Sequence, residues 1–151
     1  MIRQNIKNHI EFLAGTLGER NMFVPKNLKN AAAYIDKSFR AQGHKVSSHE
    51  YVLQKGFSRN TIVMDTFRGI FPSNFPSGSK EPVATNIEIE VPGNVYMDEI
   101  ILVGAHYDSV IGSPGANDNA SGTAGLLEIG NLLSGKKLKR TVRLVAFVNE
   151  E

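Results

Sequence analysis

The sequence contains no cysteine, which excludes disulfide bonds and thiolate-held zinc from the chemistry of these 151 residues. Any bound metal ion must therefore be held by His, Asp or Glu side chains. The sequence also lacks a large excess of either charge, because it contains 17 basic and 15 acidic residues. The basic residues are scattered along the chain, so we expect neither nucleic acid nor an anionic membrane as a partner.

Long hydrophobic runs are absent too, since no segment reaches the about 18 apolar residues typical of a membrane span. Residues 1–20 are too polar for a signal peptide, which leaves the cytoplasm or, after removal of a leader, a secreted or periplasmic location. The sequence stops at Glu151, directly after an apolar segment, whereas domains usually end in exposed polar segments. We therefore expect a truncated domain, of which residues 1–151 are the N-terminal part and the remainder is absent.

Hydrophobic periodicity divides the chain into two kinds of segment. Helices are predicted at 2–15, 26–42 and 119–134, and strands at 44–53, 86–91, 99–106 and 141–148. The runs 100–105 and 142–148 are almost continuously apolar, which is typical of strands buried on both faces of a parallel sheet. We expect these last two strands to be parallel, joined through the helix between them, and the first two to form an antiparallel edge of the same mixed sheet.

Two further segments are interpreted from composition. Residues 54–83 have no regular pattern and include a run rich in Pro, Ser and Phe, so we predict a loop or insertion there. Phenylalanines at 67, 71 and 75 would suit a helix or a substrate-facing flap, but the intervening prolines favour a loop. In the helix at 119–134 the leucines and isoleucine are interpreted as core residues: Leu126, Leu127, Ile129, Leu132 and Leu133.

Three short polar segments, 104–109, 114–122 and 147–151, lie at the ends of predicted strands or at the start of the helix that follows. In an open α/β sheet this edge is where ligands bind, so the three segments should converge. They contain an imidazole and carboxylates, which are ordinary zinc ligands. The candidate ligands are His106, Asp118 and Glu151.

Neighbouring residues suggest how such ligands would be supported. Asp108 follows His106 by two positions and can reach the second imidazole nitrogen, which fixes the tautomer of a metal-binding histidine. Asp118 stands just before a predicted helix, where a plain N-cap role and metal binding are compatible. Gly115 and Gly122 would allow a tight entry into that helix.

Glu150 and Glu151 are adjacent on a segment expected to be extended, so their side chains should point in opposite directions. One can bind a metal ion while the other accepts a proton from a metal-activated water as general base. Taken alone, the pair could equally be a charged strand end.

Together these motifs resemble the zinc-dependent aminopeptidase family with a co-catalytic two-zinc site, which includes bacterial leucyl aminopeptidases, glutamate carboxypeptidases and glutaminyl cyclases. The resemblance lies in His-x-Asp at 106–108, Gly-Ala-x-Asp-Asn-Ala-Ser-Gly at 115–122 and Glu-Glu at 150–151. It is specific over 100–151, weaker over 2–53 and absent over 54–83. It implies an α/β fold, a three-layer αβα sandwich around a mixed, mainly parallel sheet, and a single peptidase catalytic domain.

The resemblance also implies a role for each site residue. His106 binds the first zinc ion, Asp118 bridges both ions and Glu151 binds the second, while Glu150 is the general base and Asp108 orients His106. The function implied is a metallo-exopeptidase that removes N-terminal residues from a peptide substrate. Because the family's remaining ligands follow these motifs, each of the two zinc ions would have only two ligands here, and we expect residues 1–151 alone to be inactive.

Two other functions are compatible with the same fold. Glutaminyl cyclases catalyse acyl transfer on the same fold with one zinc ion, but that branch departs from the Asp-Asn-Ala-Ser-Gly form at 118–122. A scaffold domain of this fold that has lost its metals is disfavoured by the intact candidate ligands.

We also expect self-association through an open apolar edge at 99–106.

Overall fold

The computed structural model describes residues 2–52 and 83–151, so the predicted insertion at 54–83 lies outside it apart from Val83. Among the described residues, no helix combines the length and apolar character needed to cross a bilayer. The elements follow in the order α1 (Ile2–Ile10), the π-helical segment η1 (Glu11–Leu17), α2 (Pro25–Ala41), β1 (Val46–Val52), β2 (Val83–Val91), β3 (Gly93–His106), the π-helical segment η3 (Ala116–Ala120), α4 (Ser121–Leu133) and β4 (Leu138–Phe147).

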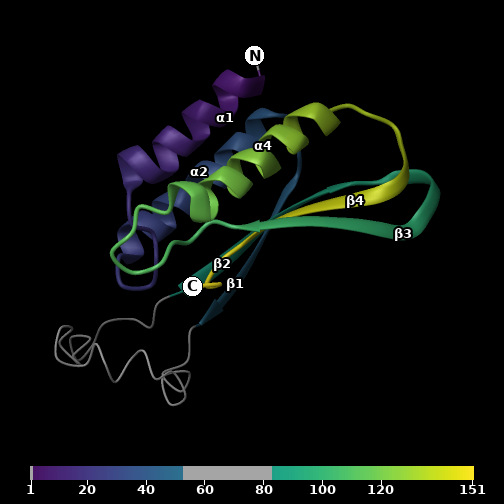
Figure 1. Ribbon diagram of the computed structural model, residues 1–151. Helices are drawn as coiled ribbons and strands as arrows, with labels where there is room; N and C mark the ends of the chain where they lie inside the picture. The colour runs from purple at the N-terminus through teal and green to yellow at the C-terminus, as the bar shows by residue number, and fades with distance from the viewer. Residues whose placement is uncertain (1, 53–82) are drawn as a thin grey trace.

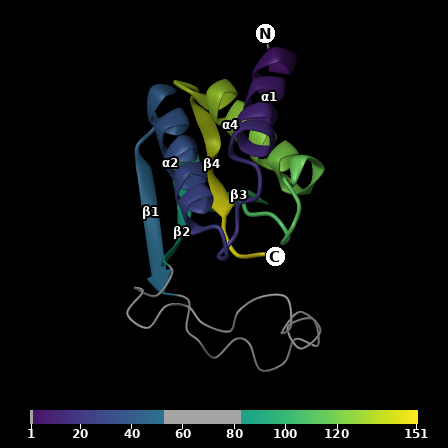
Figure 2. The same cartoon turned by 90° about the vertical axis from the view of Figure 1, so that its left-hand side faces the viewer.

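The four described strands form one mixed sheet in the order β1-β2-β4-β3. β3 and β4 are parallel, which confirms the predicted strand–helix–strand unit, and β1 pairs antiparallel with β2 as expected. β2 and β4 are also antiparallel, so the antiparallel share is larger than the sequence predicted. α1, α2 and α4 lie on one face of this sheet, which gives two layers of the expected three within the described residues (Figures 1 and 2).

The helix α2 follows its sequence pattern closely. Pro25 occupies its first turn, where the missing N–H costs no hydrogen bond, and Gly43 beyond its end has a φ of +88°. Its apolar residues recur at helical spacing and form one buried face of the helix. Its buried residues are Leu28, Ala31, Ala32, Ile35 and Phe39.

The first helix is longer than predicted, because the chain continues from α1 through η1 to Leu17 in wider, π-helical turns. It is buried mainly at its C-terminal end, in η1, where Leu13 is fully enclosed while Ile2 at the start stays exposed. α1 packs against α4, and His9 Nε2 lies 3.8 Å from an oxygen of the buried Glu128.

β3 differs from the prediction in both length and burial. It begins at Gly93 rather than at 99. Leu102 is 58% exposed on β3, whereas Leu144 on β4 is 0% exposed. The reason is position, because β4 has neighbours on both sides and β3, among the described strands, has only one. The prediction that 100–105 is buried on both faces is wrong for Ile100, Ile101 and Leu102, whereas Ala105 is buried.

α4 carries the core residues only on one side. Leu126 and Leu127 are buried as predicted, but Ile129 and Leu132 are exposed, because the helix turns them away from α1, α2 and the sheet. The helix begins at Ser121, two residues later than predicted, and the left-handed Gly135 follows its end. The two-residue delay belongs to the ligand-bearing segment η3.

Candidate metal centre

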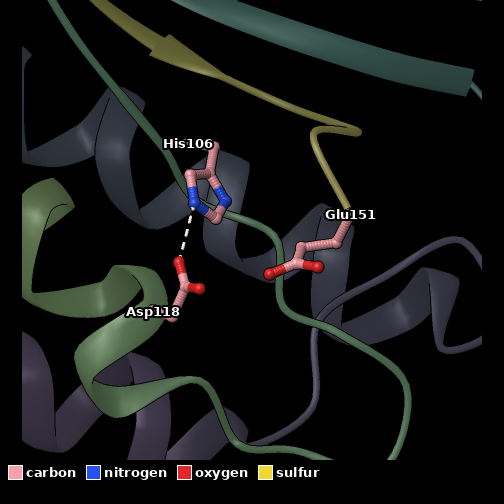
Figure 3. Close-up of side chains that lie close together, drawn as sticks. All are labelled: His106, Asp118 and Glu151. Carbon is pink, nitrogen blue, oxygen red and sulfur yellow. Dashed lines mark hydrogen bonds and ion pairs between the residues drawn. The ribbon is translucent and has the colours of Figure 1, made fainter.

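His106, Asp118 and Glu151 come from three segments that meet at one edge of the sheet (Figure 3). His106 ends β3, Asp118 lies in η3, and Glu151 follows the end of β4. Because β3 and β4 are parallel, both carry their C-terminal ends to this edge. One possible ligand atom from each residue lies within 4.8 Å of the other two.

The donor set fits a zinc ion in type and spacing. An imidazole nitrogen and carboxylate oxygens are common zinc ligands, and two atoms bound to one tetrahedral ion lie about 3.4 Å apart. His106 Nε2 is 3.0 Å from Asp118 Oδ1, close to that separation. The His106 side chain is 12% exposed and that of Asp118 is 70% exposed, so the imidazole forms the floor of a cluster that is open to solvent.

Asp108 contacts two parts of the site rather than the one predicted. Its Oδ1 faces His106 Nδ1 at 3.5 Å, which is longer than an ordinary hydrogen bond, and within the described residues neither atom has another hydrogen-bond partner. Its Oδ2 accepts hydrogen bonds from the backbone N–H groups of Glu150 at 3.0 Å and Glu151 at 3.1 Å. Because the Asp108 carboxylate faces Nδ1, the other ring nitrogen of His106, Nε2, is the one available to a metal ion. The same carboxylate also holds the segment that carries both glutamates.

The two glutamates do not point in opposite directions, as an extended segment would require. β4 ends at Phe147, and Asn149 adopts a left-handed φ of 66°, so the regular alternation of a strand is lost before Glu150. Glu150 Oε2 lies 3.8 Å from His106 Nε2, and a carboxylate oxygen of Glu151 belongs to the ligand cluster. Both carboxylates therefore lie beside the same imidazole.

Glu151 has a perturbed acidity that reflects the crowding of carboxylates. Partial burial raises the pKa of Glu151 above its ordinary value, and the charges of Asp118, Glu150 and Asp108 raise it further, while His106 opposes them. Like charges disfavour the ionised form unless a cation joins them. A proton or a metal ion at this position relieves the same repulsion.

At the start of α4, a residue other than Asp118 caps the helix, so the Asp118 carboxylate remains available to bind a metal ion. Asn119 Oδ1 accepts the backbone N–H of Gly122 at 2.8 Å, so Asn119 rather than Asp118 caps the helix. The Asp118–Asn119 peptide bond is cis. Gly115 has a φ of +56°, and a Cβ there would lie 2.4 Å from Asp118 O, which explains the glycine. The N-cap interpretation of Asp118 is wrong, and its side chain faces His106 instead.

Sequence reasoning missed Arg20, whose side chain is fully buried behind the site. It donates to the carbonyl oxygens of Tyr107 and Gly115, next to the two ligand-bearing segments. A Glu-Arg pair in a short helix connection usually lies on the surface, so no signal in the sequence identified it. The other histidines lie elsewhere, with His44 Nε2 2.9 Å from Gly130 O and His49 Nε2 3.4 Å from Glu88.

Residues 86–151 match the profile of peptidase family M28. The chain is 31% identical to the uncharacterized protein YfbL of Escherichia coli over 156 residues, which cover 98% of this chain and 40% of that protein. It is 46% identical to the aminopeptidase YwaD of Bacillus subtilis over 65 residues, covering 43% of this chain and 14% of that protein. The chain thus spans well under half the length of these curated relatives.

Solved structures with similar folds include two enzyme classes. The zinc aminopeptidase BSAP from Bacillus subtilis gives a TM-score of 0.74 at 18% identity, covering 98% of this chain and 61% of that one. A glutaminyl cyclase from Fimbriiglobus ruber gives 0.70 at 18% identity, covering 100% of this chain and 46% of that one. At these identities the likeness establishes the fold, an α/β sheet with helices of the zinc exopeptidase type.

Proposed function

Because this chain belongs to peptidase family M28, we propose that it supplies His106, Asp118 and Glu151 to the two-zinc centre of a metallo-aminopeptidase. The observation that carries the proposal is the meeting of one imidazole nitrogen and two carboxylate oxygens within 4.8 Å at the ligand-binding edge of the sheet. The sequence shared with aminopeptidases over the same segment supports peptide hydrolysis as the reaction.

In this proposal the side chains divide the binding of metal between them. His106 would hold the first zinc ion through Nε2, since its Nδ1 faces Asp108. Asp118 would hold both ions, because its largely exposed carboxylate has a second oxygen free of His106, and Glu151 would hold the second ion. Zinc bound here would polarise the scissile carbonyl and acidify an attacking water molecule.

Glu150 is proposed as the general base. Its Oε2 lies 3.8 Å from His106 Nε2, inside the cluster's reach, yet Glu150 is not part of the set whose ligand atoms lie within 4.8 Å of one another. Its exposed carboxylate can therefore accept a proton from water at Oε2 and pass it to the leaving amine. The substrate class proposed is a peptide with a free N-terminal residue.

We further propose that the active enzyme is a longer polypeptide and that residues 1–151 alone bind zinc weakly without turnover. Within the described residues each proposed zinc ion has two protein ligands, whereas catalytic sites normally use three. The chain also spans only 40% of its Escherichia coli relative, which supports the same view.

The test is calorimetric titration with zinc, combined with an aminoacyl-nitroanilide assay, on the wild-type chain and two variants. His106→Gln should abolish the weak binding, and the matched control His49→Gln, at an exposed position on β1, should retain it. Equal zinc binding in wild type and His106→Gln would contradict the site. Tight binding of two zinc ions with turnover in the 151-residue chain would contradict the count of ligands.

A glutaminyl cyclase is the second candidate, favoured by the fold likeness to enzymes of that class. The Asp-Asn-Ala-Ser-Gly form at 118–122 supports the peptidase instead. Assaying the longer polypeptide with an aminoacyl-nitroanilide and with a peptide that begins with glutamine separates the two. Zinc binding without either activity would favour a scaffold domain.

Self-association through β3 is proposed as a property of the 151-residue chain. Among the described strands β3 is paired on one side only, and its middle residues Ile100, Ile101 and Leu102 are exposed. An open apolar edge of this kind invites pairing with another chain. Light scattering should detect oligomers that a Leu102→Lys substitution reduces.

A further inference from the structure

Arg20 is a fully buried cation that lies outside the proposed ligand set. Its guanidinium nitrogens lie within hydrogen-bond distance of five backbone carbonyl oxygens, three of which share the two N–H groups of Nη1, and no carboxylate of the described residues is hydrogen-bonded to it. The acceptors are the carbonyl oxygens of Leu13 at 3.0 Å, Gly18 at 2.9 Å, Tyr107 at 2.8 Å, Pro114, and Gly115 at 3.1 Å.

These acceptors belong to segments far apart in the sequence. Leu13 and Gly18 lie at the end of the first helix, Tyr107 directly follows β3, and Pro114 and Gly115 directly precede η3. The guanidinium is planar and rigid, so it fixes the relative positions of the carbonyl groups that it binds. Arg20 therefore joins the N-terminal helix to both sides of the site.

The backbone of Arg20 strengthens the same junction. Its N–H donates to Ser109 Oγ at 3.0 Å, and its carbonyl oxygen accepts the N–H of Ser109 at 2.9 Å. Ser109 Oγ in turn donates to the carbonyl oxygen of Ser113 at 3.0 Å. Three side-chain and two backbone hydrogen bonds of Arg20 thus bind the connection 107–115.

The surroundings of Arg20 compensate its buried charge. Burial lowers the pKa of Arg20 below its ordinary value, and the nearby carboxylate of Asp108 opposes that effect. A buried guanidinium with carbonyl acceptors for its donors is stable, whereas a missing acceptor would leave an unsatisfied charged donor. Gly115 leaves room for this arrangement, because a Cβ there would lie 3.1 Å from Arg20 Nη2.

We propose that Arg20 is a positioning residue of the metal centre, which sets the distance between the strand end that carries His106 and the segment that carries Asp118. Tyr107 O lies one residue from both His106 and Asp108, and Gly115 O lies three residues before Asp118. Arg20 thus holds the backbone on each side of the 3.0 Å contact between His106 Nε2 and Asp118 Oδ1. The inference rests on the proposed zinc site for its consequence, which is metal affinity.

The experiment compares Arg20→Met, which keeps the aliphatic volume without donors, and Arg20→Lys, which keeps the charge without the planar fork. Arg40→Met is the matched control, because Arg40 is exposed and its only ion-pair partner among the described residues is Asp36 on the same helix. The zinc affinity of each folded variant is measured by calorimetry, and the His106 ring nitrogen shifts are measured by NMR without metal.

Arg20→Met should bind zinc about tenfold more weakly than wild type, at the lower end of the loss seen when groups behind a metal ligand are removed. Arg20→Lys should fall in between, and Arg40→Met should match wild type. The metal-free ring shifts of His106 should move in Arg20→Met and stay unchanged in Arg40→Met. A purely structural role would lower the unfolding temperature and leave both the affinity and the ring shifts of the folded protein unchanged.

Ser109→Ala keeps the inference testable where Arg20→Met does not fold. It removes the acceptor of the Arg20 N–H without touching the guanidinium, and it should shift the His106 ring signals in the same direction by a smaller amount. Unchanged ring shifts in the folded Arg20 and Ser109 variants would overturn the proposal. A wild-type chain that binds no zinc would instead overturn the metal centre, while the metal-free shifts would still decide the role of Arg20.

Discussion

The segment that follows β3 and the middle of β3 itself reverse the usual relation between residue type and burial. Asp108 is 2% exposed just beyond the end of the strand, whereas Leu102, four residues before that end, is 58% exposed. The polar segment is buried because protein groups bind its charges and backbone atoms. The apolar segment is exposed because, within the described residues, only β4 lies beside it. Burial here follows the neighbours available to a residue more closely than its hydrophobicity.

The largest expected effect comes from one substitution made on two adjacent strands. Leu144→Ala on β4 should lower the free energy of unfolding by about 3 kcal/mol, because it removes a fully buried side chain from the core. Leu102→Ala on β3 should change it by less than about 0.5 kcal/mol. Urea unfolding of the monomer, at protein concentrations too low for self-association, measures both, and similar losses would mean that the middle of β3 is covered within the monomer.

A second pair of variants tests the polar side of the comparison. Asp108→Asn should lower the free energy of unfolding by about 2 kcal/mol, since it weakens hydrogen bonds to two backbone N–H groups and removes a carboxylate charge that stabilises the buried Arg20. Asp98→Asn, on the exposed part of β3, should change it by less than about 0.5 kcal/mol. Equal effects in urea unfolding would show that the buried carboxylate is not a structural anchor.

The smallest expected effect concerns Glu151, whose negative charge is repelled by neighbouring carboxylates. The pKa of Glu151 is raised in the folded state, so between the ordinary and the raised value the folded protein binds more protons and its stability falls as pH increases. Glu151→Gln should therefore unfold at a slightly higher temperature than wild type at neutral pH without metal. The difference should vanish below the ordinary pKa of glutamate.

Thermal unfolding across this pH range checks the result, with Glu50→Gln on the exposed edge of β1 as the control. Added zinc should reverse the order at neutral pH, because the wild-type carboxylate then binds a cation. A Glu151→Gln variant that is never more stable than wild type without metal would contradict the proposed repulsion.

The sequence predicted the parts of the molecule in which one residue pattern decides the outcome. The apolar residues at helical spacing from Leu28 to Phe39 predict both the helix α2 and its buried face. The apolar run that ends at Phe147 predicts the strand β4. The motifs around His106, Asp118 and Glu151 could be assigned to one edge because parallel strands end together.

The remainder depends on long-range contacts that no local pattern records. Exposure of Leu102 follows from strand order, and the cap at Asn119 follows from how the chain enters α4. Glu150 turns toward His106 because Asn149 has a left-handed φ and because the Asp108 carboxylate accepts a hydrogen bond from the Glu150 N–H. From the sequence, Arg20 would be expected on the surface. It is buried because the folded chain brings carbonyl groups from distant segments to its guanidinium.

The placement of Arg20 has a practical consequence for handling the protein. The first twenty residues are far from the metal-binding motifs in sequence, yet their last member is hydrogen-bonded between the segments that carry those motifs. A protease nick or deletion that displaces Arg20 would therefore remove hydrogen bonds from segments that carry the metal-binding motifs, although the cut itself lies about ninety residues away from them in sequence.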